Sequence, residues 1–318
     1  MAVTFDIVIP TYGQRSTLDR TLATLAGEDL PDALKFVHVV ENGPRMGAEK
    51  VCMAYKDVLP IQYHYEEPPG ASGARNVGIR ASSSQYIIFL DDDIRPVPGA
   101  IHAYEEAFVT SGVRSFFGGP LIPDYDKPPP QWLIEFLPDS AKGFALGSDP
   151  KTVDAPTYFL GGNWAVPRSA FDEVGLFEGP SATGVRGGGL GEEDRLQKRM
   201  RAAGYLAVYV PSAGALHFVP ENRCNKAFVR RRRWRTGYGD GELVATEPGH
   251  HRIVFGAPAW FWRRALAACW NYAKILRPGN SNEERFRRLL GVYYGFGRIQ
   301  GYWHGARSRG NVPQRVER

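Results

Sequence analysis

Cysteine is scarce in this sequence, which also has no long run of uncharged apolar residues. The 318 residues include three cysteines, which lie far apart and form no CxxC pair. This argues against a disulfide framework or a cysteine-based zinc site and favours a reducing compartment. Arginine and lysine interrupt the most apolar segment, residues 253–276, so we expect no membrane-spanning helix. Asp6 interrupts the first apolar run, so we predict no cleavable signal peptide and a cytoplasmic protein.

Positive charge is concentrated at the carboxyl end of the chain. Residues 221–318 hold 20 Lys and Arg against 7 Asp and Glu, whereas the first 220 residues hold 19 against 27. Aromatic residues are also frequent there, among them Trp260, Phe261, Trp262 and Trp270. A basic, aromatic segment is typical of surfaces that meet phosphate groups or a membrane interface. We therefore divide the chain into a domain at 1–225 and a basic, aromatic, mainly helical tail at 226–318.

Short apolar runs alternate with helical patterns over the first 90 residues. Strands are expected at 5–9, 36–40, 61–65 and 86–90, and helices at 18–26, 48–58 and 74–81. This alternation predicts an α/β fold with a mostly parallel sheet and helices on both faces. Polar or Gly-rich residues follow the strands, at 10–13, 41–43 and 91–93. They should converge on one crevice, because ligands bind at the carboxyl ends of parallel strands.

The pattern loosens in the middle of the chain. Residues 118–153 are rich in proline, and we expect a loop with one short helix there. Helices are then predicted at 169–174 and 192–203, followed by a strand at 205–210. The glycine-rich segment 184–191 should be mobile and able to close over a substrate.

Three adjacent carboxylates, Asp91, Asp92 and Asp93, follow the apolar run at 86–90. They repel one another unless a cation neutralises them, and alternate carboxylates can share a hard ion such as Mn²⁺ or Mg²⁺. Such an ion offsets the charge that develops on a diphosphate leaving group. The structural alternative is an acidic turn that caps a helix. His217 is more often structural as a lone histidine, but beside this site it becomes a third metal ligand.

A second acidic group, at residues 192–194, opens a predicted amphipathic helix after the glycine-rich segment. Acidic residues in a first helical turn are stabilised by the helix dipole, so capping is the alternative to a functional role. The functional hypothesis is a carboxylate that deprotonates an acceptor hydroxyl as a general base.

The sequence alone does not decide the function of two cationic motifs. Residues 70–76, with two glycines and Arg75, place backbone amides and a guanidinium at a strand-to-helix join, where a phosphate can bind. The run Arg230 to Arg235 fits a solvated charge cluster or a nucleic-acid patch. No nucleic-acid-binding motif accompanies it, and the acidic first 220 residues would repel a polyanion, so we expect no nucleic-acid partner.

Taken together, these motifs resemble the family-two glycosyltransferases, which are inverting enzymes with a GT-A fold. The resemblance covers residues 6 to about 234 and rests on six motifs in the family's order. They are Val8-Ile9-Pro10-Thr11-Tyr12, Val39-Val40-Glu41-Asn42-Gly43, Gly73-Ala74-Arg75-Asn76-Val77-Gly78, Phe89-Leu90-Asp91-Asp92-Asp93, Gly161-Gly162-Asn163 and Gly191-Glu192-Glu193-Asp194.

The resemblance implies a role for individual residues in donor binding. Residues that hold the nucleotide sugar would be Pro10, Thr11, Tyr12, Arg15, Glu41, Arg75, Asp91 and Asp92. Glu41 stands where the family usually has Asp, which keeps an acceptor for a base N–H. The divalent metal, Mn²⁺ or Mg²⁺, would be held by Asp91, Asp93 and His217.

The resemblance also places the catalytic base and the acceptor site. Counting back from Leu196, Arg199 and Gly204 puts Glu193 on the family's catalytic position, and Asp194 remains the alternative. A one-residue slip turns a helical side chain by about 100°, so only one of the two can face the hydroxyl. Acceptor contacts are expected from Gly162, Asn163, Trp164, Arg233 and Trp234; the last two fit an Arg-x-x-Arg-Trp motif of related enzymes.

The sequence thus predicts an inverting glycosyltransferase with a GT-A domain and a mainly helical extension. It would move a sugar from a nucleotide diphosphate, expected to be a UDP-sugar, to an acceptor hydroxyl on a glycan or lipid-linked substrate. Polysaccharide or glycolipid biosynthesis on the inner face of the cell membrane would follow, with the tail as a peripheral membrane contact. The alternative for the tail is that its aromatic residues pack on the catalytic domain. Alternatives are a nucleotidyltransferase, and a non-enzymatic binder of nucleic acid or membrane that uses Arg230 to Arg235.

Overall fold

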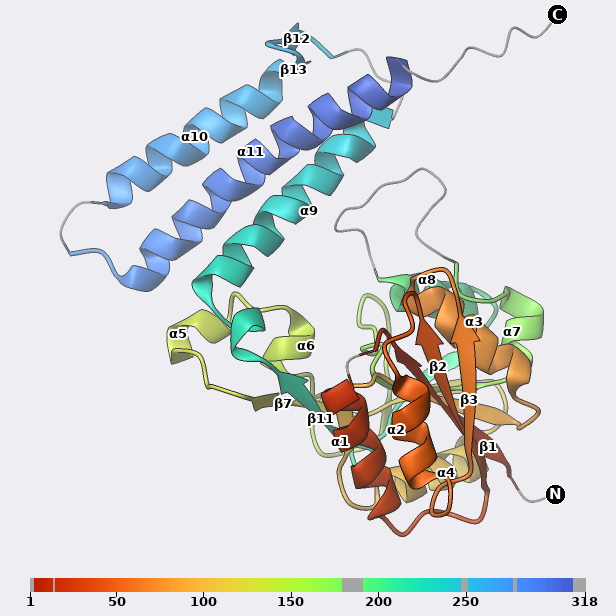
Figure 1. Cartoon of the computed structure of the whole chain (residues 1–318). Helices are drawn as coiled ribbons and strands as arrows, with labels where there is room; N and C mark the ends of the chain where they lie inside the picture. The colour runs from red at the N-terminus through yellow and green to blue at the C-terminus, as the bar shows by residue number, and fades with distance from the viewer. Residues whose placement is uncertain (1–2, 14, 179–190, 247–250, 277–278, 311–318) are drawn as a thin grey trace, which may run out of the picture. The chain divides into compact units, whose positions relative to one another are not determined.

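The computed structural model describes residues 3–13, 15–178, 191–246, 251–276 and 279–310, which form two compact units (Figure 1). The first unit holds the described residues up to Asp126, together with those of 138–179 and 191–220. The second holds 127–137 and the described residues from Glu221 onward. The segment 127–137 therefore belongs with the carboxyl-terminal residues, although about 70 residues of the first unit follow it in the chain.

An eight-stranded sheet in the order β3-β2-β1-β4-β9-β6-β10-β8 forms the centre of the first unit. Its strands are β1 (Phe5–Thr11), β2 (Leu34–Asn42), β3 (Ile61–Glu66), β4 (Tyr86–Leu90), β6 (Ser115–Gly118), β8 (Lys151–Thr152), β9 (Asn163–Pro167) and β10 (Leu206–Tyr209). Strands β3, β2, β1 and β4 run parallel, as do β6 and β10. Strand β9 is antiparallel between β4 and β6. The carboxyl ends of β1, β2 and β4 therefore lie at one edge, as predicted.

Helices cover both faces of this sheet. The helices of the unit are α1 (Arg15–Ala26), α2 (Ala48–Tyr55), α3 (Ala71–Ala81), α4 (Ala100–Ser111), α6 (Asp139–Lys142), α7 (Ser169–Val174) and α8 (Glu192–Ala202). Successive residues of β1 point to opposite faces: Ile7 and Ile9 pack in a cluster with α1, α2 and α4, and Val8 packs with α3, α7 and α8. Helix α3 approaches β1 closely, because a Cβ at Gly78 would lie 2.5 Å from a Val8 methyl carbon.

The proline-rich residues 118–153 hold more structure than one short helix, which corrects our expectation. They include β7 (Leu121–Tyr125), α5 (Gln131–Ile134), α6 and β8. Strand β7 pairs in parallel with β11 (Ala215–Val219), which also pairs with β5 (Ile94–Pro96) in a three-stranded sheet. Because β7 is an edge strand, it tolerates Pro123, which lacks a backbone donor. Its partner lies about 90 residues away in the chain, so local pattern gives little sign of it.

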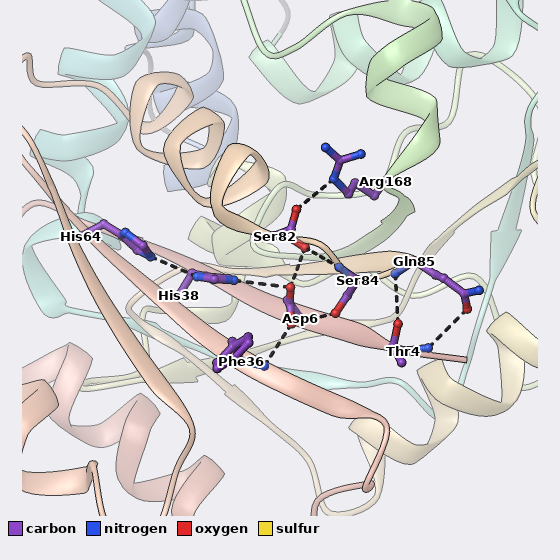
Figure 2. Close-up of polar contacts among 9 residues, drawn as sticks. All are labelled: Thr4, Asp6, Phe36, His38, His64, Ser82, Ser84, Gln85 and Arg168. Atoms are coloured by element: carbon purple, nitrogen blue, oxygen red, sulfur yellow. Dashed lines mark hydrogen bonds and ion pairs between the residues drawn. The ribbon is translucent and has the colours of Figure 1, made fainter. Parts of the chain in front are cut away.

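A buried polar network explains why Asp6 interrupts the first apolar run (Figure 2). The Asp6 carboxylate accepts hydrogen bonds from the hydroxyls of Ser82 at 2.5 Å and Ser84 at 3.0 Å, and from a backbone N–H of β2. His38 Nε2 lies 3.4 Å from the same carboxylate, and His38 Nδ1 lies 3.0 Å from His64 Nε2. Burial raises the pKa of Asp6, but these hydrogen bonds outweigh it and hold the pKa below its usual value.

Helices dominate the second unit. They are α5, a short 3-10 helix (Glu221–Arg223), α9 (Lys226–Thr246), α10 (Ala259–Ile275) and α11 (Asn282–Gly310), with a small hairpin of β12 (Ile253–Val254) and β13 (Ala257–Pro258). Glycines let α9 and α11 touch backbone to backbone: a Cβ at Gly237 would lie 2.2 Å from the Tyr294 carbonyl, and one at Gly301 1.8 Å from the Tyr238 carbonyl. The predicted helical extension is confirmed. No helix in the described part of the chain is long and apolar enough to cross a membrane.

Candidate active site

Arg75 joins two of the predicted site carboxylates. It lies on α3 with its side chain 3% exposed, and its Nη1 donates to Glu193 Oε1 at 2.6 Å. Its Nη2 donates to Asp91 Oδ1 at 2.8 Å. The three residues come from α3, the first turn of α8 and the end of β4, so folding alone brings them together. Burial raises the pKa of Asp91, and repulsion from Asp93 and Glu193 adds to this rise against the opposing effect of Arg75.

Two glycines before β9 leave room for the same carboxylates. A Cβ at Gly161 would lie 2.2 Å from Glu193 Oε1, and one at Gly162 would lie 3.0 Å from Asp91 Oδ2. Real Cβ atoms do not approach other atoms as closely as the first of these distances. Gly161 is therefore required for the position of Glu193, and Gly162 borders the space beside Asp91.

The three acidic residues at the start of α8 have different surroundings. Asp194 Oδ2 accepts a hydrogen bond from the Gly191 N–H at 3.3 Å and so caps the helix. Glu192 accepts a hydrogen bond from the Ser72 hydroxyl on α3. Of the three, Glu193 is the one that meets Arg75 beside Asp91. Burial raises the pKa of Asp194.

Gln197, which we did not assign to the site, holds α8 in place. Its side chain is fully buried, accepts from the Phe159 N–H at 2.9 Å and donates to the Phe159 carbonyl at 2.8 Å. It lies four residues after Glu193 on the same helix, so this pair of bonds fixes the rotation of the helix about its axis. In the sequence, the sign of this role was an amide residue beside Leu196 in the predicted amphipathic helix.

The end of β1 is tied to the acidic triplet. The Thr11 hydroxyl donates to Asp92 Oδ2 at 2.5 Å, and Asn42 Nδ2 donates to the Thr11 carbonyl at 2.9 Å. Pro10 is buried in the strand, and Tyr12, one residue beyond Thr11, is 53% exposed. Strand ends that were predicted to converge therefore do so. The side chain of Arg15 and the glycine-rich residues 184–190 lie outside the described residues.

Glu41 is 1% exposed, and its carboxylate is occupied by protein donors. Oε1 accepts backbone N–H groups of Met46 at 2.6 Å, Gly47 at 3.0 Å and Ala48 at 3.3 Å. Oε2 accepts the Tyr63 hydroxyl at 2.7 Å. Burial raises the pKa of Glu41, but these bonds outweigh it and lower the pKa below its usual value. In this structure Glu41 organises the turn before α2, rather than offering a free acceptor to a nucleobase.

Asp93 and His217 form the part of the predicted metal site that the structure brings together. His217 Nε2 lies 3.6 Å from Asp93 Oδ2, and its Nδ1 lies 2.5 Å from the Ser140 carbonyl. Burial lowers the pKa of His217, but Asp93 and the Ser140 carbonyl outweigh it and raise the pKa. Among the described residues no group of three His, Cys, Asp or Glu stands ready to hold a metal ion.

The donor types nevertheless fit a divalent ion. Nδ1–H of a ligating histidine commonly donates to a carbonyl, which directs Nε2 at the metal, and His217 has this arrangement with Ser140. Carboxylate oxygens of Asp91 and Asp93 suit Mn²⁺ or Mg²⁺. A metal ion at Nε2 would compete with a proton there, and the raised pKa of His217 favours the proton.

Asn163 and Trp164, from which we expect acceptor contacts, both have buried side chains with partners inside the protein. The Asn163 amide accepts from the Tyr104 hydroxyl at 3.0 Å and donates to the carbonyls of Pro120 at 3.0 Å and Ala213 at 2.8 Å. The Trp164 ring is fully buried in the core and stacks on Phe89. In this structure both residues are structural, because β9 lies in the middle of the sheet.

Arg233 and Trp234 lie on α9 of the second unit. The Arg233 guanidinium stacks over the Tyr294 ring at 4.5 Å. Trp234 Nε1 donates to Gln300 at 3.1 Å, and its ring meets Tyr293 edge to face. Trp234 therefore contributes to the packing of α9 on α11, whereas Arg233 keeps an exposed side chain.

Comparison with known proteins decides the family. The family model described as Glycosyl transferase family 2 matches residues 6–175, which include β1, Arg75 and the acidic triplet. The chain belongs to glycosyl transferase family 2. This membership confirms the predicted glycosyltransferase function, in place of a nucleotidyltransferase or a non-enzymatic binder.

Relatives of this glycosyltransferase include a curated protein that matches along most of its length. It is the succinoglycan biosynthesis protein ExoM of Rhizobium meliloti (strain 1021), 27% identical over 294 residues, which cover 88% of this chain and 87% of that protein.

Two solved structures have a similar fold. The mannosyltransferase PcManGT from Pyrobaculum calidifontis, in complex with GDP-Man and Mn²⁺, aligns with a TM-score of 0.52 at 16% identity and covers 99% of this chain and 88% of that one. S. aureus TarS 1–349, in complex with UDP-GlcNAc, gives the same TM-score at 12% identity and covers 98% and 93%. The GT-A fold predicted for this glycosyltransferase is thereby confirmed.

Proposed function

We propose that this glycosyltransferase transfers its sugar in the crevice around Arg75, with Glu193 as the general base. The observation that carries the proposal is the shared guanidinium, which holds Glu193 and Asp91 at 2.6 and 2.8 Å. A base must be fixed in place, and a charge-assisted hydrogen bond from a buried arginine holds the Glu193 carboxylate. Asp194 is the less suitable candidate, since its carboxylate caps α8.

The proposed reaction is a direct displacement with inversion at the anomeric carbon. The acceptor oxygen forms a bond to that carbon while the bond to the diphosphate oxygen breaks and the electron pair leaves with the diphosphate. Glu193 takes the proton of the acceptor hydroxyl. Arg75, which already contacts both carboxylates, supplies positive charge beside the position where the diphosphate departs.

The nucleoside of the donor, which we propose to be UDP, would lie at the ends of β1 and β2. The exposed ring of Tyr12 offers a stacking surface, and Thr11 and Asp92 are fixed by their mutual hydrogen bond. Pro10 limits the flexibility of the strand end. Glu41 would act indirectly, by holding the turn that contains Met46 and Gly47.

A divalent ion, Mn²⁺ or Mg²⁺, is proposed on Asp91 and Asp93 with His217 as a further ligand. Such an ion supplies a Lewis acid for the departing diphosphate. Independently of the ion, the Ser140 carbonyl orients the His217 ring and keeps Nε2 toward Asp93.

The acceptor is proposed to be a glycan or a lipid-linked sugar in polysaccharide or glycolipid biosynthesis. A relative named for succinoglycan biosynthesis matches along 88% of this chain, which supports that class of product. Gly162 lies against Asp91, since a Cβ at this position would come within 3.0 Å of Asp91 Oδ2, and this proximity supports a place for Gly162 beside the acceptor. Arg233 offers an exposed cation for a polar or anionic part of the acceptor.

Peripheral contact with the cytoplasmic face of the membrane is proposed for α10. Arg263, Leu266, Trp270 and Lys274 are spaced for one face of the helix, and all four are exposed. Leu266 is 63% and Trp270 64% exposed, and the Lys274 ammonium lies 5.2 Å from the centre of the Trp270 ring. Apolar and aromatic side chains flanked by cations suit an anionic lipid surface. Other tail aromatics pack inward: Phe261 is buried, and Trp262 Nε1 donates to the Val254 carbonyl.

A screen of nucleotide sugars tests the proposed reaction. The purified chain is incubated with each sugar, an excess of Mn²⁺ and a panel of glycan and lipid-linked acceptors, and the product linkage is determined by NMR. We expect one donor to give a product of inverted anomeric configuration. A product with retained configuration would contradict the proposed displacement by Glu193.

A further inference from the structure

A hollow in the second unit concentrates positive charge at residues other than Arg75, Asp91 and Glu193. It has a volume of about 440 Å³ and is bordered by α9, α11 and Phe136 from the segment 127–137. Three guanidinium groups line it, from Arg232, Arg233 and Arg287. None of the described lining residues is acidic.

The three arginines differ in how they are already engaged. Arg232 is exposed and makes no ion pair with any residue that the structure describes. The Arg233 guanidinium stacks over the Tyr294 ring, and in this arrangement the N–H groups in the guanidinium plane can still donate hydrogen bonds. Arg287 pairs with Glu135 at 2.6 Å and Glu283 at 3.0 Å, but all three side chains are more than 40% exposed. Ion pairs so exposed are weak, so an anion can compete for Arg287.

The rest of the lining is mostly apolar, and the Thr236 hydroxyl, which also belongs to it, donates to the Arg232 carbonyl at 3.1 Å. Val229 and Leu290 are buried in the wall, and Phe136 contacts Arg287 through its ring at 5.1 Å. An apolar wall strengthens charge-assisted hydrogen bonds nearby, because it keeps water and its screening away. A cavity of this volume also falls in the range that holds a small organic ligand rather than a bare ion.

We propose that this hollow, the α9–α11 pocket, binds a phosphate or diphosphate group that carries an apolar substituent. A guanidinium group can donate two parallel hydrogen bonds to two oxygens of one phosphate. Two or three guanidinium groups match the negative charge of a diphosphate better than that of a single carboxylate. The apolar wall accommodates the first carbons attached to the phosphate. Three sources offer this chemistry: a lipid-linked acceptor, a bilayer phospholipid and a free phosphate compound.

The lipid-linked source deepens the proposed function and rests on it in part. A lipid-linked acceptor that carries its sugar on a diphosphate has the anionic group and the adjoining apolar carbons that this pocket would bind. The pocket also accounts for part of the run Arg230 to Arg235, which the sequence left undecided. Arg232 and Arg233 line the pocket, whereas the exposed Arg231 and Arg235 are not among its lining residues.

The test measures binding by calorimetry on the full chain and therefore needs no turnover. Farnesyl diphosphate, inorganic pyrophosphate, and vesicles of phosphatidylglycerol or phosphatidylcholine are the probes, at 150 mM salt. The pocket variant is Arg232→Gln with Arg233→Gln. The matched control, Arg231→Gln with Arg235→Gln, removes the same charge from the same helix. Circular dichroism and thermal unfolding check that both variants fold.

We expect farnesyl diphosphate to bind more tightly than pyrophosphate, and the pocket variant to bind it about 10-fold or more weakly. The control variant should retain binding to within about 3-fold, because exposed charges contribute little. Equal binding of pyrophosphate and farnesyl diphosphate would contradict the proposed role of the apolar wall and leave a site for free phosphates only. Binding of phosphatidylglycerol vesicles alone, lost in the pocket variant, would assign it to bilayer lipids.

Two results would overturn the proposal. One is the absence of binding by every probe, and the other is an equal loss in the pocket and control variants, which reduces the effect to general electrostatics. Neither depends on whether the chain transfers sugar. If the chain transfers sugar but binds no probe, the proposed pocket is rejected and the proposed reaction stands. If it binds farnesyl diphosphate but transfers no sugar, the proposed reaction is rejected and the proposed pocket stands.

Discussion

Arg75 donates to Glu193 across 2.6 Å, and this contact joins two segments that are 118 residues apart in the chain. Helix α3 follows a glycine-containing turn, and α8 begins at Glu192, with Gly191 as its N-cap residue. The guanidinium is buried, so its charge requires partners, and Asp91 and Glu193 provide them. The contact therefore both stabilises the fold and sets the position of the proposed base.

The first prediction concerns Gly161, which lies against Glu193. Gly161→Ala adds a Cβ that would lie 2.2 Å from Glu193 Oε1, so the carboxylate must move. We expect turnover to fall on the order of 10²-fold, since a displacement of about 1 Å costs this much in other active sites. Initial rates at saturating donor and acceptor measure it.

The matched control for Gly161 is Gly27→Ala, whose Cβ meets backbone atoms at ordinary distances of 3.5 and 3.7 Å. Its turnover should equal that of the unsubstituted chain. Unchanged turnover in Gly161→Ala would mean that Glu193 does not need the position seen here.

A second prediction is dependence on a divalent ion. Activity should disappear in excess EDTA at matched ionic strength and return with Mn²⁺ or Mg²⁺, because the clustered carboxylates bind hard cations. Asp93→Asn should weaken Mn²⁺ binding, measured by calorimetry without substrate. Asp149→Asn, at an exposed position, removes the same charge and should leave it unchanged. Full turnover in EDTA would exclude the metal role of Asp91 and Asp93.

The third prediction is a pH-dependent stability effect at Asp6. Its folded-state pKa is lowered, so its contribution to stability is present above the usual carboxyl pKa of 3.8 and is lost as pH falls through the lower folded pKa. Asp6→Asn should lower the free energy of unfolding by about 2 kcal/mol at pH 7, since it weakens buried bonds to a charged group. The difference from the unsubstituted chain should narrow below pH 3.8.

Urea unfolding of the two chains at several pH values measures this difference. His64 acts in the same direction, because burial, followed by repulsion from His38, lowers its pKa, so an unfolded chain takes up its proton more readily. Stability should therefore also fall as pH drops through the usual range of histidine. A constant difference between Asp6→Asn and the unsubstituted chain at all pH values would mean that Asp6 is not ionised in the fold.

The fourth prediction tests the exposed face of α10. Leu266→Ser with Trp270→Ser should reduce co-sedimentation with phosphatidylglycerol vesicles at low salt, because it removes the apolar contacts of the proposed membrane surface. Met53→Ser with Val109→Ser removes two comparably exposed apolar side chains from the first unit and should have no effect. Equal vesicle binding by the α10 variant and the unsubstituted chain would leave α10 without a membrane role.

Much of the fold and part of the site could be predicted from the sequence. Strand periodicity and the polar residues after each strand place Thr11, Arg75 and Asp91 at one edge, and the structure has them there. Long-range packing decides the surroundings of other predicted site residues. Trp164 follows a glycine motif as an acceptor residue would, but β9 enters the sheet between β4 and β6 and buries it.

Other features needed three-dimensional contacts that no local pattern reveals. The Glu41 carboxylate accepts hydrogen bonds from a backbone N–H of the turn after β2 and from the Tyr63 hydroxyl on the neighbouring strand. The choice between Glu193 and Asp194 depends on which way the first turn of α8 faces, and Gln197 fixes that rotation through Phe159. A one-residue ambiguity in the sequence thus becomes a difference between a site residue and a helix cap.

The central claim is tested most directly by comparing Glu193→Gln with Asp194→Asn under saturating donor and acceptor. Both substitutions remove one carboxylate from the same helical turn, and Asn retains the ability to cap α8. We predict that Glu193→Gln lowers turnover by at least about 10²-fold, with nucleotide affinity nearly unchanged, while Asp194→Asn stays near the unsubstituted rate. The reverse result, loss of turnover in Asp194→Asn alone, would contradict the assignment of Glu193 as the base.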